Sequence, residues 1–221
     1  MKTATSLQDK PRIVVLISGS GTNLQAFIDA IANGSLHAEI SAVISNKNGV
    51  KGLQRANSAG IPTEVIDHRA YESRESFDAQ LADCIERYQP DLVILAGFMR
   101  ILTPGFVNRF LGKMLNIHPS LLPKYQGLNT HQRAIEAGDK EAGTTVHFVT
   151  PELDGGPIIV QARVPVIPGD NVDSLAARVL LEEHKIYPMA AEWFCQGRLE
   201  LTTSGVTLDG KRLPTNGCSY A

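Results

Sequence analysis

Two polar side chains follow an apolar run near the middle of the chain, where residues 113–117 are predicted to form a strand. Asn116 and His118 lie two residues apart, so in a strand their side chains point to the same side. Pro119 restricts His118 to an extended backbone. This pair suits acyl-type chemistry, because an amide can stabilise a developing oxyanion while an imidazole carries protons. These residues alone leave open a second interpretation, in which both side chains bond only to loop backbone.

Asp154 lies in a Leu-Asp-Gly-Gly-Pro segment that follows a predicted strand over residues 144–149. Asp in such a segment usually bonds nearby backbone and forms only a turn. A functional role requires the carboxylate to reach His118. An adjacent carboxylate favours the protonated imidazole, which makes it a better general acid near neutral pH.

A glycine-containing loop over residues 18–23, Ser-Gly-Ser-Gly-Thr-Asn, separates an apolar strand over residues 13–17 from a helix predicted over residues 23–32. Backbone N–H groups at such a helix start can bind an anion. A dinucleotide site needs a third glycine where Leu24 stands, and an acid after the second strand, which ends in Ser45 and Asn46. The loop therefore favours a single phosphate group over NAD, with a tight turn without ligand as the alternative.

Three further charged residues stand in unusual positions. Glu183 falls on the inward face of the last long helix, where a carboxylate is costly to bury; either the helix ends there and Glu183 is solvated, or it faces a ligand. Arg100 lies in a soft apolar loop over residues 97–102 that could hold a flat heteroaromatic ligand. Arg74 begins a helix, an unfavourable place for a cation, which indicates an anionic partner.

Strand and helix patterns alternate in the first half of the chain. Strands are predicted over residues 13–17, 39–44, 63–66 and 92–96, and helices over 23–32, 49–59 and 74–88. This order predicts an α/β fold: a mostly parallel twisted sheet with helices on both faces, which binds ligands at the carboxyl ends of its strands. In the second half we expect strands over 113–117, an alternating 144–149 and 158–166, a helix over 132–137, and a helix from Asp170 or Asn171 to about Lys185, broken by Pro188. Leu199 and Leu201 mark a short late strand.

The chain contains no internal repeat or linker, so we expect a single domain over residues 11–202. A flexible extension (1–10) precedes it and a polar, peripheral tail (203–221) follows it.

Composition excludes several classes of protein. Of 221 residues, 43% are hydrophobic and 20% charged, which is typical of a folded globular chain. The net charge of −2 gives no electrostatic reason to bind nucleic acid or an anionic membrane. The sequence contains neither an apolar run of about 18 residues nor a signal peptide. The three cysteines, Cys84, Cys195 and Cys218, lack metal-ligand or redox spacing, which predicts free thiols in the cytoplasm and no metal.

With these residues in view, the chain resembles the phosphoribosylglycinamide formyltransferases, a branch of the folate-dependent formyltransferase family, over about residues 11–200. The resemblance is carried by ISGSGTNLQ (17–25), LAGFMRIL (95–102), LNIHPSLLP (115–123), GTTVHFV (143–149) and LDGGP (153–157). It implies a Rossmann-like formyltransferase fold. It also implies transfer of a formyl group from 10-formyltetrahydrofolate to the amine of 5-phosphoribosylglycinamide, in purine biosynthesis.

The resemblance also implies a role for each matching residue. Asn116, His118 and Asp154 match the catalytic residues of the family. Residues matching its ribonucleotide site are Gly21, Thr22, Asn23 and Glu183. Residues matching its folate site are Arg74, Met99, Arg100, Ile101, Leu102, Asn116, Thr150 and Asp154.

Other functions remain as alternatives. Methionyl-tRNA formyltransferase and formyltetrahydrofolate hydrolase share this core but carry an additional domain, for which we expect no room here. A non-catalytic nucleotide- or phosphate-binding module would keep the glycine loop and tolerate loss of His118 and Asp154. The partners we expect are small-molecule substrates, without nucleic acid or membrane. A homodimer is compatible with the sequence, and the role of His147 is left open.

Overall fold

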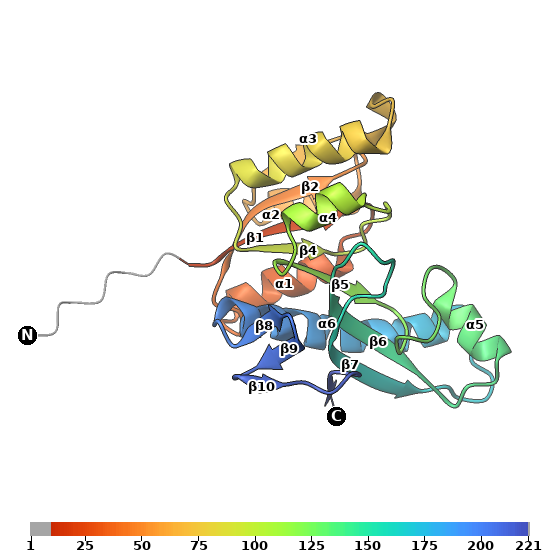
Figure 1. Cartoon of the computed structure of the whole chain (residues 1–221). Coiled ribbons are helices and arrows are strands. Elements are labelled where there is room, and N and C mark those ends of the chain that lie inside the picture. The colour runs from red at the N-terminus through yellow and green to blue at the C-terminus, as the bar shows by residue number, and fades with distance from the viewer. Residues whose placement is uncertain (1–9, 221) are drawn as a thin grey trace, which may run out of the picture.

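The computed structural model describes residues 10–220, so the predicted extension over residues 1–10 lies outside this range except for Lys10. An eight-stranded sheet of order β11-β7-β6-β5-β4-β1-β2-β3 runs through the molecule (Figure 1). Only β6 runs antiparallel to its neighbours, so the sheet is mostly parallel, as predicted. The strands are β1 Arg12–Ile17, β2 Glu39–Ser45, β3 Thr63–Val65, β4 Leu92–Leu95, β5 Met114–His118, β6 Glu141–Phe148, β7 Ile158–Pro165 and β11 Cys218–Tyr220.

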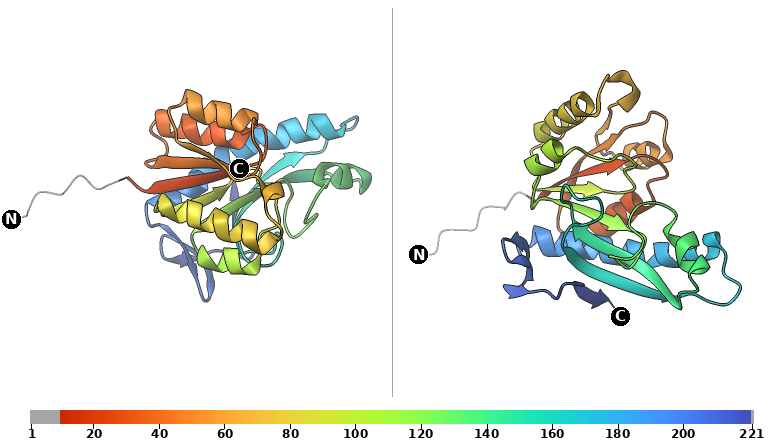
Figure 2. Two further views of the ribbon diagram at one scale, coloured as in Figure 1. Left: turned by 90° about the horizontal axis from the view of Figure 1, so that it is seen from above. Right: turned by 45° about the vertical axis from the view of Figure 1, so that its right-hand side comes forward.

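Helices cover both faces of this sheet, as the left view of Figure 2 shows. They are α1 Thr22–Ala32, α2 Lys51–Ser58, α3 Arg74–Arg87, α4 Pro104–Arg109, α5 Thr130–Glu136 and α6 Val172–Cys195, with a short 3-10 helix over His68–Ala70. Alternate side chains of β1 enter different cores. Ile13 and Val15 pack with α1, α2 and α6, whereas Val14 and Leu16 pack with α3 and α4. Burial on both faces explains why this strand is a continuous apolar run.

The strand order reverses between β1 and β4, so a ligand crevice is expected there. The chain leaves β1 toward β2 on one side and returns to β4 on the other, and ligands bind where an open sheet reverses in this way. The two loops at this point contact each other, because the backbone N–H of Met99 donates to Ser18 Oγ at 2.8 Å. The Tyr187 hydroxyl of α6 lies 3.0 and 2.9 Å from the carbonyl oxygens of Leu95 and Leu115, which links the carboxyl end of β4 to the first half of β5.

The prediction that the last long helix ends near Lys185 is wrong. Helix α6 continues to Cys195 with Pro188 inside it. A proline in a helix interior costs about 3 kcal/mol. Burial outweighs this cost, since Ile186 and Tyr187 are fully buried beside it, and each contributes about 1.5–3 kcal/mol.

The structure contains more regular structure than the sequence patterns predict. The expected late strand, β8 Leu199–Thr202, forms a three-stranded antiparallel sheet with β9 Gly205–Leu208 and β10 Lys211–Arg212. In the segment expected to be a polar tail, Val206 is buried, and β11 extends the main sheet by pairing with β7. The predicted alternation in β6 is also wrong, because the strand is buried along its length apart from Glu141. Among residues 10–220, none of the helices has the length and apolar character that a membrane span requires.

Candidate active site

His118 and Asp154 meet at the carboxyl end of β5. The distance from His118 Nδ1 to Asp154 Oδ2 is 3.5 Å, and the two side chains are only 7% and 10% exposed. The other ring nitrogen, Nε2, lies 2.9 Å from the carbonyl oxygen of Tyr125. Both neighbours are oxygen atoms that accept hydrogen bonds, so each ring nitrogen of His118 faces an acceptor. The structure therefore brings together the imidazole and the acid that the functional interpretation requires.

The loop that carries Asp154 is tightly constrained. Asp154 has a left-handed backbone with φ of 49°, and its Oδ2 accepts a hydrogen bond from the backbone N–H of Gly127 at 2.9 Å. Gly156 permits the loop to lie against β6, because a Cβ at that position would collide with the carbonyl group of Phe148. Asp154 thus occupies a turn, as its sequence context indicates, and also faces His118.

Asn116 is oriented by a histidine whose role the sequence left open. The two residues pair across β5 and β6, and Asn116 Nδ2 lies 3.2 Å from His147 Nε2. His147 Nδ1 lies 2.9 Å from the carbonyl oxygen of Phe148, so Nδ1 carries the proton and Nε2 accepts from the amide. Burial lowers the pKa of His147, in agreement with a neutral ring. This contact leaves the second amide N–H of Asn116 available to a ligand.

The glycine loop lies against α2. A Cβ at Gly21, where φ is 69°, would lie 2.6 Å from the Cα of Gly52, so the close approach requires glycine. Arg55 fixes the loop further, because its Nε donates to the carbonyl oxygen of Ser20 at 2.9 Å. No side chain caps the start of α1 at Thr22, which leaves N–H groups of its first turn free for an anion.

Glu183 is buried at this loop rather than solvated at a helix end. Its Oε2 accepts a hydrogen bond from Asn23 Nδ2 at 2.8 Å, across 160 residues of sequence. Burial raises the pKa of the Glu183 carboxyl, and the Asn23 bond opposes the rise. Asn23 Oδ1 is buried without a hydrogen-bond partner among the described residues. The pair therefore leaves the Asn23 amide oxygen free to accept a hydrogen bond beside the glycine loop.

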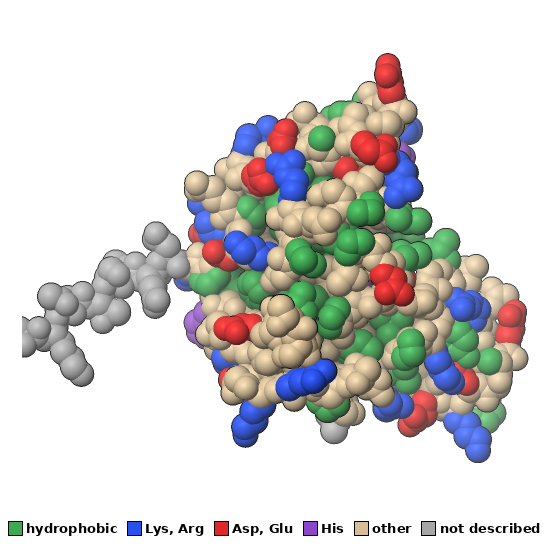
Figure 3. Space-filling view, viewed as in Figure 1, with side chains coloured by type: hydrophobic (Ala, Val, Ile, Leu, Met, Phe, Trp, Pro, Cys, Tyr) green, Lys and Arg blue, Asp and Glu red, His purple; other side chains and the backbone are tan. Residues whose placement is uncertain are grey.

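In the loop over residues 97–102, some side chains lie in the core and others are exposed to solvent. Phe98 and Leu102 lie in the core, whereas Met99 and Ile101 are 61% and 59% exposed. Arg74 at the start of α3 donates to the carbonyl oxygen of Ile101 at 3.0 Å, which anchors the loop. Hydrophobic side chains gather on this face in the band between α4 and α5 (Figure 3).

Two further residues predicted for this site, Arg100 and Thr150, follow β4 and β6 in the chain. The guanidinium of Arg100 lies 5.8 Å from the centre of the Phe77 ring, and Thr150 is half-buried just after β6. Within residues 10–220, no group of three or more His, Cys, Asp and Glu side chains is arranged to hold a metal ion.

Comparison with known proteins identifies the family of this chain. The chain belongs to the formyl transferase family, whose model matches residues 11–191. More specifically, it is similar to phosphoribosylglycinamide formyltransferases. That of Escherichia coli (strain K12) is 55% identical over 205 residues, which cover 93% of this chain and 97% of that protein. That of Haemophilus influenzae is 52% identical, with the same coverage of each chain.

Solved structures show the same relationship. The phosphoribosylglycinamide formyltransferase of Coxiella burnetii, solved in complex with CHES, superposes with a TM-score of 0.93 at 51% identity, covering 96% of this chain and 100% of that one. Glycinamide ribonucleotide transformylase 1 of Symbiobacterium toebii gives 0.89 at 46% identity, covering 94% and 99%. These likenesses extend over nearly the whole of each chain, so they include both the glycine loop and the end of β5.

Proposed function

We propose that this protein transfers a formyl group from 10-formyltetrahydrofolate to the amine of 5-phosphoribosylglycinamide, a step of purine biosynthesis, in the cytoplasm. The relatives named for this enzyme match almost the full length of the chain. The observation that carries the chemical proposal is the pairing of His118 with Asp154 at the end of β5, two residues beyond Asn116.

The reaction begins with attack of the substrate amine on the formyl carbon. As the new C–N bond forms, the formyl oxygen becomes an oxyanion, and the free N–H of the Asn116 amide donates to it. Because His147 holds the amide, this donor is oriented before the substrate arrives. Donors placed in advance stabilise developing charge without a cost of reorganisation.

In this proposal His118 and Asp154 carry out the proton transfers. A protonated His118 stabilises the same oxyanion or delivers a proton to the folate nitrogen as its bond to the formyl carbon breaks. Asp154 keeps the ring oriented and charged and, with a bound water, accepts the proton that the attacking amine loses. The contact to Asp154, at 3.5 Å, is longer than the 2.9 Å contact to Tyr125, so Nδ1 is the nitrogen that exchanges partners more readily.

The substrates occupy the crevice from its two sides. The phosphate of the ribonucleotide binds at Gly21, Thr22 and Asn23, and Glu183 contacts the same substrate. On the other side, the folate lies over the loop of residues 97–102, with Met99 and Ile101 supplying exposed apolar surface and Arg74 meeting its charged tail. Holding both substrates in one crevice converts a bimolecular encounter into an oriented reaction.

An absorbance assay of folate deformylation tests the proposal. Deformylation should require 5-phosphoribosylglycinamide, and His118→Ala and Asp154→Asn should each slow it at least ~10²-fold, the scale of general acid–base catalysis. His37→Ala is a matched control, because this histidine has an exposed side chain and lies just before the start of β2, away from the carboxyl ends of the strands. Normal turnover in both active-site variants would reject the catalytic assignment. Ribonucleotide binding without any deformylation would indicate a non-catalytic phosphate-binding module.

A further inference from the structure

Tyr125 has a backbone conformation that a bulky residue rarely adopts. Its φ is 57°, in the left-handed region, which is costly for a large side chain unless the surroundings impose it. The carbonyl oxygen of this same residue is the partner of His118 Nε2, at 2.9 Å. The orientation of the imidazole therefore depends on whatever keeps Tyr125 in this conformation.

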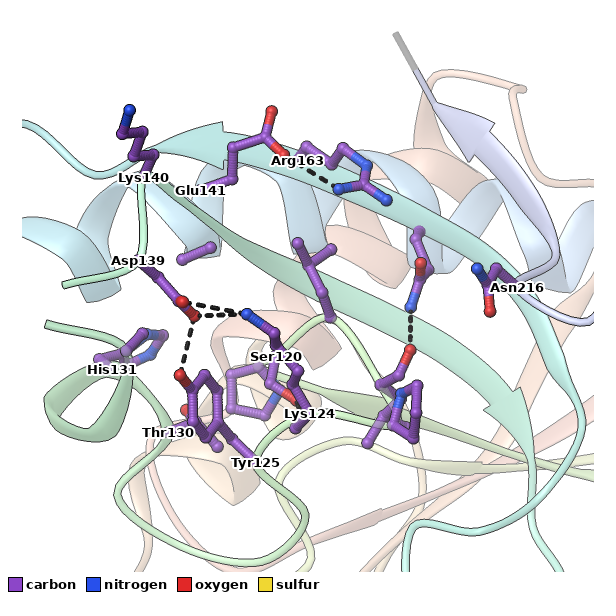
Figure 4. Close-up of a pocket in the computed structure, with 17 residues that line it drawn as sticks. Ser120, Lys124, Tyr125, Thr130, His131, Asp139, Lys140, Glu141, Arg163 and Asn216 are labelled. Carbon is purple, nitrogen blue, oxygen red and sulfur yellow. Dashed lines mark hydrogen bonds and ion pairs between the residues drawn. The ribbon is translucent and has the colours of Figure 1, made fainter. Parts of the chain in front are cut away.

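Asp139, in the turn between α5 and β6, anchors the Tyr125 side chain. The tyrosine hydroxyl donates to Asp139 Oδ2 at 2.8 Å, and Lys124 Nζ lies 3.0 and 3.1 Å from the two carboxylate oxygens, as Figure 4 shows. The guanidinium of Arg133 lies 5.0 Å from the centre of the Tyr125 ring. The hydrogen bonds from Lys124 and Tyr125 lower the pKa of Asp139, so the acceptor is a carboxylate at neutral pH.

Other contacts fix the preceding part of the loop independently of Asp139. Ser120 Oγ donates to the carbonyl oxygen of Lys124 at 2.6 Å, and Thr145 Oγ1 donates to that of Ser120 at 2.7 Å. Gln161 holds the carbonyl oxygen of Leu122 at 2.8 Å. Residues after Tyr125 are held as well, because Arg133 donates to the carbonyl oxygen of Gln126 at 2.7 Å and Gly127 donates to Asp154 at 2.9 Å. The contact with Asp139 is therefore what fixes the Tyr125 side chain itself, and its loss would leave residues 120–124 attached to β6 and β7.

A cavity next to the anchor gives Tyr125 room to move. Its volume is about 610 Å³, and its lining includes Tyr125, Asp139, Thr130 and His131. The cost of a left-handed tyrosine and the gain from a hydrogen bond to a charged acceptor are similar in size, so removing the acceptor shifts the balance between backbone conformations.

We propose that Asp139 and the Tyr125 hydroxyl are positioning residues for formyl transfer: their hydrogen bond sets the Tyr125 carbonyl, which in turn orients His118. This inference rests on the proposed function, because that function assigns His118 a catalytic role. Neither Asp139 nor the tyrosine ring touches a substrate in this account, so the effect of changing them passes entirely through the imidazole.

The test measures kcat and both KM values for Tyr125→Phe and Asp139→Ala, each in the natural chain and in a His118→Ala background. In the natural chain we expect each substitution to lower kcat about tenfold, which equals a rise of about 1.4 kcal/mol in the activation free energy. Both KM values should stay within about twofold of those of the natural protein. In the His118→Ala background we expect no further loss, because residues that act as a unit are not additive. Asp139→Asn keeps an oxygen that accepts from the tyrosine, so it should recover most of the rate.

Arg163→Ala is the matched control, because Arg163 lines the same cavity and pairs with Glu141 at 3.0 Å; its kcat should be unchanged. A kcat within twofold of the natural protein for both Tyr125→Phe and Asp139→Ala, while His118→Ala is slow, would overturn this inference alone. A tenfold loss that persists in the His118→Ala background would also overturn it, since the residues would then act elsewhere. Full activity of His118→Ala would overturn the catalytic assignment, and this inference with it.

Discussion

Replacement of Gly21 by alanine tests how the glycine loop is built. Gly21 combines a left-handed backbone, with φ of 69°, and close contact with α2. An added Cβ would lie 2.6 Å from the Cα of Gly52, a backbone atom that cannot rotate away. The variant must therefore accept an unfavourable backbone conformation and also push the loop away from α2.

The two costs can be separated with a second glycine. A left-handed conformation costs a residue with a side chain about 1–2 kcal/mol. Overpacking against fixed neighbours adds about 1–3 kcal/mol, so Gly21→Ala should lose about 2–5 kcal/mol of the free energy of unfolding. Gly34, after α1, also has a left-handed backbone, with φ of 81°, but no atom lies within 4 Å of an added Cβ. Gly34→Ala should therefore lose only the conformational cost, about 1–2 kcal/mol.

Urea unfolding of the natural protein and the two variants measures both losses of stability, provided that the m-values of the three proteins are equal. Because the loop is proposed to hold the phosphate, Gly21→Ala should also raise the KM for 5-phosphoribosylglycinamide at least about tenfold, the scale of about 1.4 kcal/mol of lost binding. The KM for the folate should stay within about twofold. Equal stability of the two alanine variants, together with an unchanged ribonucleotide KM in Gly21→Ala, would refute this account of the loop.

Two further predictions concern pH. The raised pKa of Glu183 means that the folded chain holds a proton that the unfolded chain has released, so stability falls as pH rises from about 4 through that raised pKa. Urea unfolding of Glu183→Gln should show a gain over the natural chain that grows with pH and vanishes at low pH; a gain independent of pH would contradict the burial argument. The lowered pKa of His147 has the opposite sign: the unfolded chain takes up the proton first as pH falls below about 6.5. The His147 contribution to the free energy of unfolding should thus be lost between about pH 7 and 5, so over this range the natural chain should lose more stability, or gain less, than His147→Asn. The same change of stability with pH in both proteins would contradict this role of His147.

Local patterns predicted much of the fold because they reflect local physics. The apolar runs of β1 and β4 are buried on both faces, and the helices between the early strands carry apolar residues at helical spacing, so their bounds follow within a few residues. Helix α6 was predicted too short, because Pro188 is a local signal for a break, whereas the burial that overrides it comes from residues distant in sequence.

The site was predictable only in part for a related reason. The spacing of Asn116 and His118 on one strand is a local feature, and the proximity of Asp154 was a requirement of the functional interpretation. The pairing of Asn116 with His147 depends on the register between β5 and β6. The bond from Asn23 to Glu183 joins α1 to α6, and the Tyr125 carbonyl is a main-chain group that no residue type reveals. Such contacts are set by tertiary structure, and a single sequence carries no direct signal for them.

A crystal structure with 5-phosphoribosylglycinamide and a formyl-folate analogue that cannot transfer its group would test the central claim most directly. The account predicts the formyl oxygen about 3 Å from Asn116 Nδ2, with the His118 ring on the same side of the formyl group and the phosphate at the first turn of α1. A formyl group bound beyond the reach of a single bridging water from both Asn116 and His118 would contradict it.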